Sequence, residues 1–173
     1  MKLAKNLDRL GTETAFSVLA EAKKLEAQGK EMIHLGLGQP DFMTPKHIMD
    51  AAKKAIDDGH HGYVLANGIV ECRQAVSRKI KSLYKKEVSP ERIMIMPGGK
   101  PTMYFAIQMI GEPGAEIVHP TPGFPIYESM INYTGAKAVP YDLTKEKDLK
   151  FDPEKILSLI TDKTRLVILI NPN

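Results

Sequence analysis

The chain has 173 residues, of which 43% are hydrophobic and 26% are charged, as expected for a soluble globular protein that can bury a core. Its net charge is only +3 and its basic residues are spread along the chain, which argues against nucleic-acid binding. One cysteine leaves no partner for an internal disulfide, the N-terminus has no apolar signal segment, and no apolar run is long enough to span a membrane. We therefore expect a cytoplasmic protein.

Helical spacing dominates the first part of the chain. Apolar residues recur on one face over residues 14–28, and Gly29 follows them as a stop signal. Residues 32–35 have the composition of a short strand. Thr44 and Pro45 then predict the start of a second helix, with the threonine as N-cap and the proline at the first helical position.

A third helix is predicted over residues 69–84. Its inward face consists of Cys72, Val76, Ile80 and Leu83. We interpret the cysteine as a structural residue of that face. His60 and His61 lie in the preceding loop, where adjacent side chains point apart and no further ligand has zinc-site spacing, so no metal site is predicted.

From residue 89 onward, predicted strands alternate with predicted helices. The predicted strands cover residues 93–96, 115–119, 136–140 and 165–170. The predicted helices cover residues 101–110 and 125–133 and a segment that Asp152 and Pro153 would cap. This alternation predicts an α/β fold with a mainly parallel sheet and helices on both of its faces, preceded by an N-terminal helical segment.

Gly98 and Gly99 form a turn between a predicted strand and a predicted helix, and this turn is the first candidate binding site. Glycine adopts backbone angles that other residues avoid, and the free N–H groups at the start of a helix bind anions such as phosphate. An ordinary turn of an αβ unit would explain the same residues. The P-loop pattern is not met, because Met94 stands where glycine is required and Pro101 follows Lys100.

Ligands of parallel sheets bind beyond the carboxyl ends of the strands, where three loops of this chain are expected. Residues 97–100 contain the paired glycines, residues 119–125 contain three prolines around an aromatic residue, and Asn171 begins an Asn-Pro-Asn sequence. His119 lies at the end of a predicted strand, where the second loop begins, and a structural, hydrogen-bonded role is favoured for it. A strand so close to the last residue predicts that the chain continues beyond Asn173.

Four short motifs and a terminal Asn-Pro-Asn sequence occur in order along the chain. They are Gly38-Gln39-Pro40-Asp41-Phe42, Tyr63-x4-Gly68-x4-Arg73, Gly98-Gly99-Lys100, Pro122-Gly123-Phe124-Pro125-x-Tyr127 and the terminal Asn171-Pro172-Asn173. In this order they resemble the N-terminal part of the class I/II, aspartate-aminotransferase-like enzymes of fold type I, which use pyridoxal 5′-phosphate (PLP). The resemblance implies an N-terminal segment over residues 1–44 and the first part of the large PLP-binding domain over residues 45–173. Cys72 departs from the family's usual leucine and affects only packing.

The resemblance implies a cofactor site at the glycine turn. Backbone N–H groups of Gly99 and Lys100 would hold the PLP phosphate, and Gly98 would shape the turn. Phe124 would stack on the pyridine ring, which a flat aromatic surface can bury and orient. A core phenylalanine is the alternative interpretation of that residue.

Two further roles are implied by the resemblance. Tyr63 would reach the phosphate of the neighbouring subunit, which implies a homodimer, and Gly38 would contact the α-carboxylate of the substrate. An ordinary loop tyrosine and an ordinary turn glycine are the alternatives for these positions.

The implied activity is the transfer of an amino group from an amino acid to a 2-oxo acid. The resemblance places no catalytic residue within the 173 residues, because the lysine that forms a Schiff base with PLP is expected downstream of Asn173. We therefore expect the chain to be inactive alone. Two alternatives stay open, namely a non-catalytic α/β fragment that acts only in binding or dimerisation, and a nucleotide-binding domain that uses the glycine turn.

Overall fold

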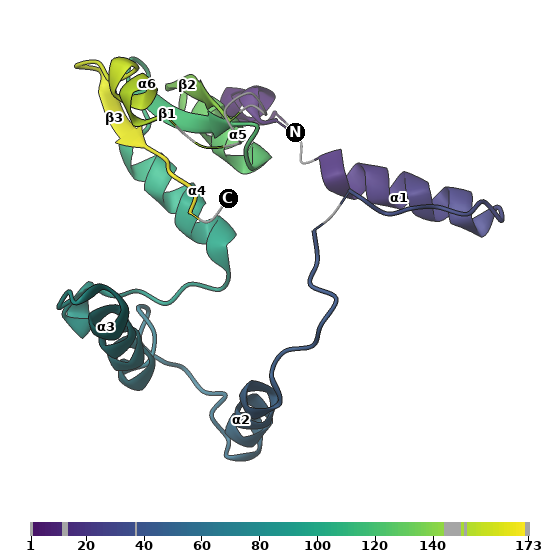
Figure 1. Ribbon diagram of the computed structural model, residues 1–173, viewed down its shortest axis with the longest axis vertical. Helices are drawn as coiled ribbons and strands as arrows, with labels where there is room; N and C mark the ends of the chain where they lie inside the picture. Colours follow the sequence, from purple (N-terminus) through teal and green to yellow (C-terminus); the bar gives the residue numbers. More distant parts are fainter. Residues whose placement is uncertain (1, 12–13, 37, 144–149, 151, 172–173) are drawn as a thin grey trace. The chain divides into compact units, whose positions relative to one another are not determined.

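The computed structural model describes residues 2–11, 14–36, 38–143, 150 and 152–171 (Figure 1). The chain divides into two compact units. The sheet unit consists of Met1–Gly36 and Gly98–Asn173, and the helical unit consists of Leu37–Pro97.

A parallel three-stranded sheet forms the centre of the sheet unit. Strand β1 (Glu116–Thr121) lies in the middle, between β2 (Lys137–Asp142) and β3 (Thr164–Val167), and both neighbours run parallel to it. Ile117 is the register partner of Ala138 on one side and of Leu166 on the other. The predicted parallel α/β sheet is thereby confirmed, although β3 is shorter than the strand predicted over residues 165–170.

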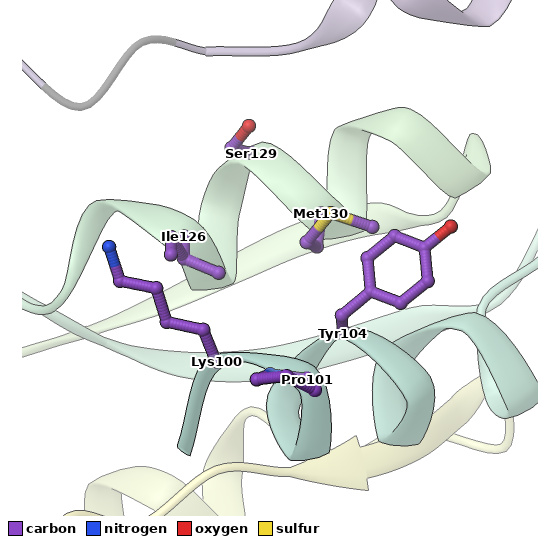
Figure 2. A pocket seen from close by; sticks show the side chains of 6 residues that line it. All are labelled: Lys100, Pro101, Tyr104, Ile126, Ser129 and Met130. Atoms are coloured by element: carbon purple, nitrogen blue, oxygen red, sulfur yellow. The ribbon is translucent and has the colours of Figure 1, made fainter. Parts of the chain in front are cut away.

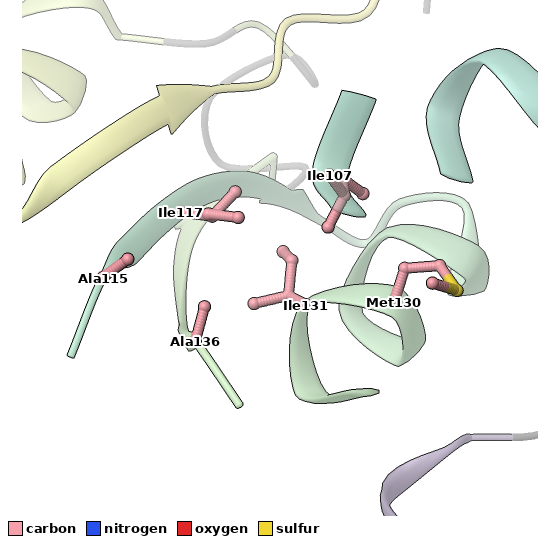
Figure 3. Close-up of a cluster of buried hydrophobic side chains, with 6 residues drawn as sticks. All are labelled: Ile107, Ala115, Ile117, Met130, Ile131 and Ala136. Atoms are coloured by element: carbon pink, nitrogen blue, oxygen red, sulfur yellow. The ribbon is translucent and has the colours of Figure 1, made fainter. Parts of the chain in front are cut away.

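Helices cover both faces of this sheet, as predicted. Side chains of a strand alternate between faces, so Ile117 and Val118, both 0% exposed, point into different clusters. The first cluster lies under α4 (Gly99–Ile110) and α5 (Pro125–Thr134), and Figure 3 shows its buried members, which are Ile107, Ala115, Ile117, Met130, Ile131 and Ala136. The second cluster brings Val118 together with Ile156 of α6 (Pro153–Ser158).

Local signals set the ends of these helices. The carboxylate of Asp152 accepts hydrogen bonds from the backbone N–H groups of Glu154 and Lys155, at 3.0 and 3.3 Å, so the predicted cap of α6 is confirmed. Pro125 begins α5, and Gly135 follows its last residue with a φ of +87°.

The N-terminal segment contributes two helices. Helix α1 (Thr14–Ala27) confirms the predicted first helix, and a short 3-10 helix, η1 (Lys5–Arg9), precedes it without having been predicted. The Arg9 guanidinium donates 2.8 Å hydrogen bonds from Nε to the carbonyl of Asn132 and from Nη2 to that of Tyr133. Arg9 therefore satisfies carbonyl groups at the end of α5, where a positive charge also favours the helix dipole.

The helical unit contains α2 (Lys46–Asp57), α3 (Val70–Tyr84) and the 3-10 helix η2 (Pro90–Arg92). Helix α2 confirms the predicted second helix, but the predicted cap is wrong: Pro45 itself occupies the N-cap position with a ψ of 137°, and no side chain caps the helix. Leu83 is 57% exposed, so its predicted inward orientation on α3 is also wrong.

Two predicted strands are not formed. Residues 32–35 and 93–96 belong to no strand of the described sheet, and Ile33 and Leu35 are 84% and 90% exposed. An apolar run becomes a strand only when neighbouring strands accept its backbone hydrogen bonds, and sequence composition does not reveal those neighbours. In the described part of the chain, no helix is long and apolar enough to cross a membrane.

Candidate functional site

The glycine turn precedes the first residue of α4. Gly98 has φ +86° and ψ 172°, a combination that is essentially restricted to glycine, and no atom lies within 4 Å of where its Cβ would be. No side chain caps the helix at this end, and its first turn contains no acidic residue. The backbone N–H groups at the start of α4 therefore form a candidate anion site, next to Lys100.

The packing of α4 against α5 brings Lys100 and Phe124 together. The ammonium nitrogen of Lys100 lies 5.5 Å from the centroid of the Phe124 ring, within the range of a cation–π interaction. Phe124 immediately precedes α5 and is half-buried. Its ring also meets Tyr127 edge to face, with the two ring centroids 6.2 Å apart. An aromatic face and a cation thus lie beside the glycine turn.

A cavity of about 270 Å³ lies between the first turns of α4 and α5. Figure 2 shows the side chains that line it, which are Lys100, Pro101, Tyr104, Ile126, Ser129 and Met130. Aliphatic and aromatic groups thus form most of its wall. The Ser129 hydroxyl donates to the carbonyl of Gly11 at 3.2 Å and accepts from its N–H at 3.0 Å. A mostly apolar wall with a few polar groups is typical of a site for a small organic molecule.

The loop between β1 and α5 is tightly turned, so that Gly123 lies close to the backbone of Pro120. A Cβ on Gly123 would lie 2.5 Å from the carbonyl oxygen of Pro120, so only glycine fits there. The same carbonyl accepts a 3.2 Å hydrogen bond from Nδ1 of His119, a side chain that is only 4% exposed. Burial lowers the pKa of His119, although the bond to Pro120 and the charge of Glu128 oppose that shift.

This burial predicts that stability falls in mild acid. The pKa of His119 in the folded chain lies below its usual value of 6.5, so the unfolded chain takes up a proton more readily as the pH falls below that value. The stability that neutral, buried His119 contributes is fully present above pH 6.5 and is lost as the pH falls through its folded-state pKa. Urea unfolding between pH 7.5 and 5 should therefore show a smaller pH dependence for His119→Asn than for the wild type. The exposed His60, changed to asparagine, is the matched control, and an unchanged pH dependence in His119→Asn would contradict the prediction.

The predicted site residues fall into two groups. Gly98, Gly99, Lys100 and Phe124 meet within the sheet unit, as described above. Tyr63 and Gly38 belong to the helical unit: the tyrosine is fully exposed, and nothing lies within 4 Å of a Cβ placed on the glycine. The proposed roles of all six residues stay predictions. Asn171 is exposed, and the remainder of its motif, residues 172–173, lies outside the described residues.

One buried charge was missed by sequence reasoning. The Arg73 side chain is 2% exposed in the helical unit, and it donates hydrogen bonds to backbone carbonyls of Gly68 and Pro90. Its position beside Cys72, one turn from Val76, could have indicated burial, because these residues lie on one side of α3.

Among the described residues, no group of three or more His, Cys, Asp or Glu side chains is arranged to hold a metal ion.

Residues 30–173 match the family model of aminotransferase class I and II. The chain is 34% identical to an aspartate aminotransferase of Bacillus subtilis (strain 168) over 173 residues, which is 100% of this chain and 44% of that protein. It is also 34% identical, over 171 residues, to a (5-formylfuran-3-yl)methyl phosphate transaminase of Methanocaldococcus jannaschii, again covering 44% of the relative. The chain therefore spans less than half the length of these relatives.

Solved structures of aminotransferases also match this chain over less than half of their own length. Aspartate aminotransferase from Thermus thermophilus with maleate superimposes with a TM-score of 0.92 at 29% identity, covering 100% of this chain and 45% of that one. Alanine aminotransferase from Pyrococcus furiosus superimposes with a TM-score of 0.91 at 29% identity, covering 99% of this chain and 44% of the other.

Proposed function

The chain belongs to the class I and II aminotransferase family, and from this we propose that it forms the phosphate- and ring-binding part of a PLP-dependent aminotransferase. The proposed reaction transfers an amino group from an amino acid to a 2-oxo acid, in a cytoplasmic homodimer. The observation that carries the proposal is the glycine turn at the start of α4, with Lys100 and Phe124 beside it.

The residues present fit the cofactor. A phosphate needs N–H donors and positive charge, and the start of α4 offers backbone N–H groups that no side chain caps, beside a lysine and without an acidic residue in the first turn. A pyridine ring needs a flat apolar surface, and Phe124 offers one within reach of the same lysine. These N–H groups, the lysine and the aromatic ring support recognition of a phosphate and of a pyridine ring at neighbouring positions.

When bound, PLP supplies the electron sink that amino-group transfer requires. The residues of this chain then bind PLP and orient it. Gly99 and Lys100 hold the phosphate through their backbone N–H groups, while Gly98 gives the turn its shape. Phe124 holds the ring in one plane, and its own orientation is supported by the edge-to-face contact with Tyr127.

The remaining proposed roles belong to the helical unit. Tyr63 contacts the phosphate bound by the partner subunit of the homodimer, and Gly38 contacts the substrate α-carboxylate through its N–H group. The full exposure of Tyr63 supports a role in which its hydroxyl meets a group outside its own unit.

We further propose that the 173 residues alone bind PLP weakly and do not catalyse transfer. The resemblance places the family's covalent lysine at none of these residues, and the chain spans 44% of the length of a relative. The alternative is a fragment that acts only in binding or dimerisation. Reduction with borohydride in the presence of PLP, followed by intact-mass analysis, tests this proposal: one specific adduct on the 19.2 kDa chain would overturn it.

The phosphate site is tested by comparing PLP with pyridoxal, which lacks the phosphate. The wild-type chain should bind PLP more tightly, and Gly98→Ala should reduce that preference by about tenfold, because alanine at such backbone angles costs about 1–3 kcal/mol. Isothermal titration calorimetry with both ligands measures this preference.

Gly62→Ala is the matched control, since Gly62 has neither a positive φ nor an atom within 4 Å of its Cβ position. Equal affinity of the wild type for the two ligands would contradict phosphate binding and leave the non-catalytic alternative. Competition by ATP at the same site would instead favour the nucleotide-binding alternative.

A further inference from the structure

Arg73 is the most deeply buried charged side chain among the described residues of the helical unit, with 2% of its side chain exposed. Its Nε donates a 3.2 Å hydrogen bond to the carbonyl of Gly68. Its Nη1 donates to the carbonyl of Pro90 at 2.9 Å and to Oε1 of Glu91 at 3.2 Å. One guanidinium therefore joins α3, the turn before it and the segment after it.

The turn that Arg73 contacts is fixed at two further points. The N–H of Gly68 donates to the carbonyl of Leu65 at 2.9 Å, and the N–H of Ile95 donates to the carbonyl of Asn67 at 3.1 Å. Gly68 has a φ of +92°, and a Cβ there would lie 2.9 Å from the Ile95 side chain. The turn 65–68 is thus packed against residue 95, and Arg73 holds it through the carbonyl of Gly68.

Tyr63 lies two residues before this turn, and its side chain is fully exposed. Its position therefore depends on the backbone that follows it. We propose that Arg73 is a positioning residue for phosphate recognition: it fixes turn 65–68, and it contributes to PLP binding only through Tyr63. This inference rests on the role of Tyr63 in the proposed function.

Lysine is the informative replacement for Arg73. It keeps the positive charge, but its single nitrogen lacks the planar fork that reaches three acceptors on two segments. Arg73→Lys, Tyr63→Phe and the double variant are compared by titration of the 173-residue chain with PLP and with pyridoxal. Each single variant should weaken PLP binding by about fivefold, as expected for one ordinary hydrogen bond, and leave pyridoxal binding unchanged.

The double variant gives the decisive result. It should bind PLP no more weakly than Tyr63→Phe, because Arg73 acts only through the tyrosine. Losses that add up in the double variant, or an equal loss of pyridoxal affinity, would overturn the inference and leave Arg73 a purely structural residue. Glu91→Gln is the control: it removes the ion pair of an exposed carboxylate, keeps both carbonyl bonds and should leave PLP binding unchanged.

Two outcomes separate this inference from the proposed function. If Tyr63→Phe leaves PLP affinity unchanged while Gly98→Ala reduces it, the inference fails and the phosphate site stands. If the wild type does not prefer PLP to pyridoxal, both fail. If Arg73→Lys does not fold, Gly68→Ala replaces it, because its Cβ displaces the same turn from Ile95. Gly68→Ala should then weaken PLP binding in the wild type but not in the Tyr63→Phe background. A further loss of PLP affinity when Gly68→Ala is added to Tyr63→Phe would overturn the inference.

Discussion

Ile117→Ala is expected to destabilise the sheet unit by about 2–5 kcal/mol, the range for truncating a large aliphatic side chain to alanine in a well-packed core. Ile117 is 0% exposed in the central strand and belongs to the cluster that contains Ile107 of α4 and Ile131 of α5. The substitution removes contacts with both helices at once. A loss of this size is a large fraction of the stability of an ordinary domain.

Urea unfolding followed by far-UV circular dichroism measures this effect. Ile33→Ala is the matched control: it makes the same chemical change at a side chain that is 84% exposed, so its effect should stay within about 0.5 kcal/mol. Similar midpoints for the two variants would mean that β1 is not the centre of the core.

The contrast between Ile117 and Ile33 also explains which elements the sequence could predict. Helices carry their hydrogen bonds within one segment, so α1 followed from its spacing and stop residue, and α6 followed from the residues that cap it. A strand depends on neighbours that are distant in sequence. Ile33 and Ile95 lie in runs of suitable composition, yet neither run is part of the described sheet.

The same distinction applies to the candidate site. The glycine turn could be predicted because the unusual backbone of Gly98 is encoded by the residue itself. The 5.5 Å approach of Lys100 to Phe124 could not, since it depends on how α4 packs against α5. The hydrogen-bond partners of Arg73 could not be predicted either, because they are carbonyl groups that lie 5 and 17 residues away in sequence.

Gly123→Ala should affect both stability and ligand binding. The new Cβ would lie 2.5 Å from the carbonyl oxygen of Pro120 and 3.2 Å from its Cγ, and backbone atoms cannot move aside as a flexible side chain can. The loop must open, at a cost of about 2–3 kcal/mol, as in other overpacked sites. Gly62→Ala, which meets nothing within 4 Å, is the control for stability.

The ligand dependence of this variant distinguishes ring binding from phosphate binding. Opening the loop displaces Phe124, the next residue, so PLP and pyridoxal should both bind more weakly and their affinity ratio should stay unchanged. Gly98→Ala should change that ratio instead, because it alters the turn whose N–H groups we propose to bind the phosphate. Titration of both variants with both ligands measures the two effects. A change in the ratio for Gly123→Ala would mean that the β1–α5 loop also shapes the phosphate site, and that Phe124 does not act on the ring alone.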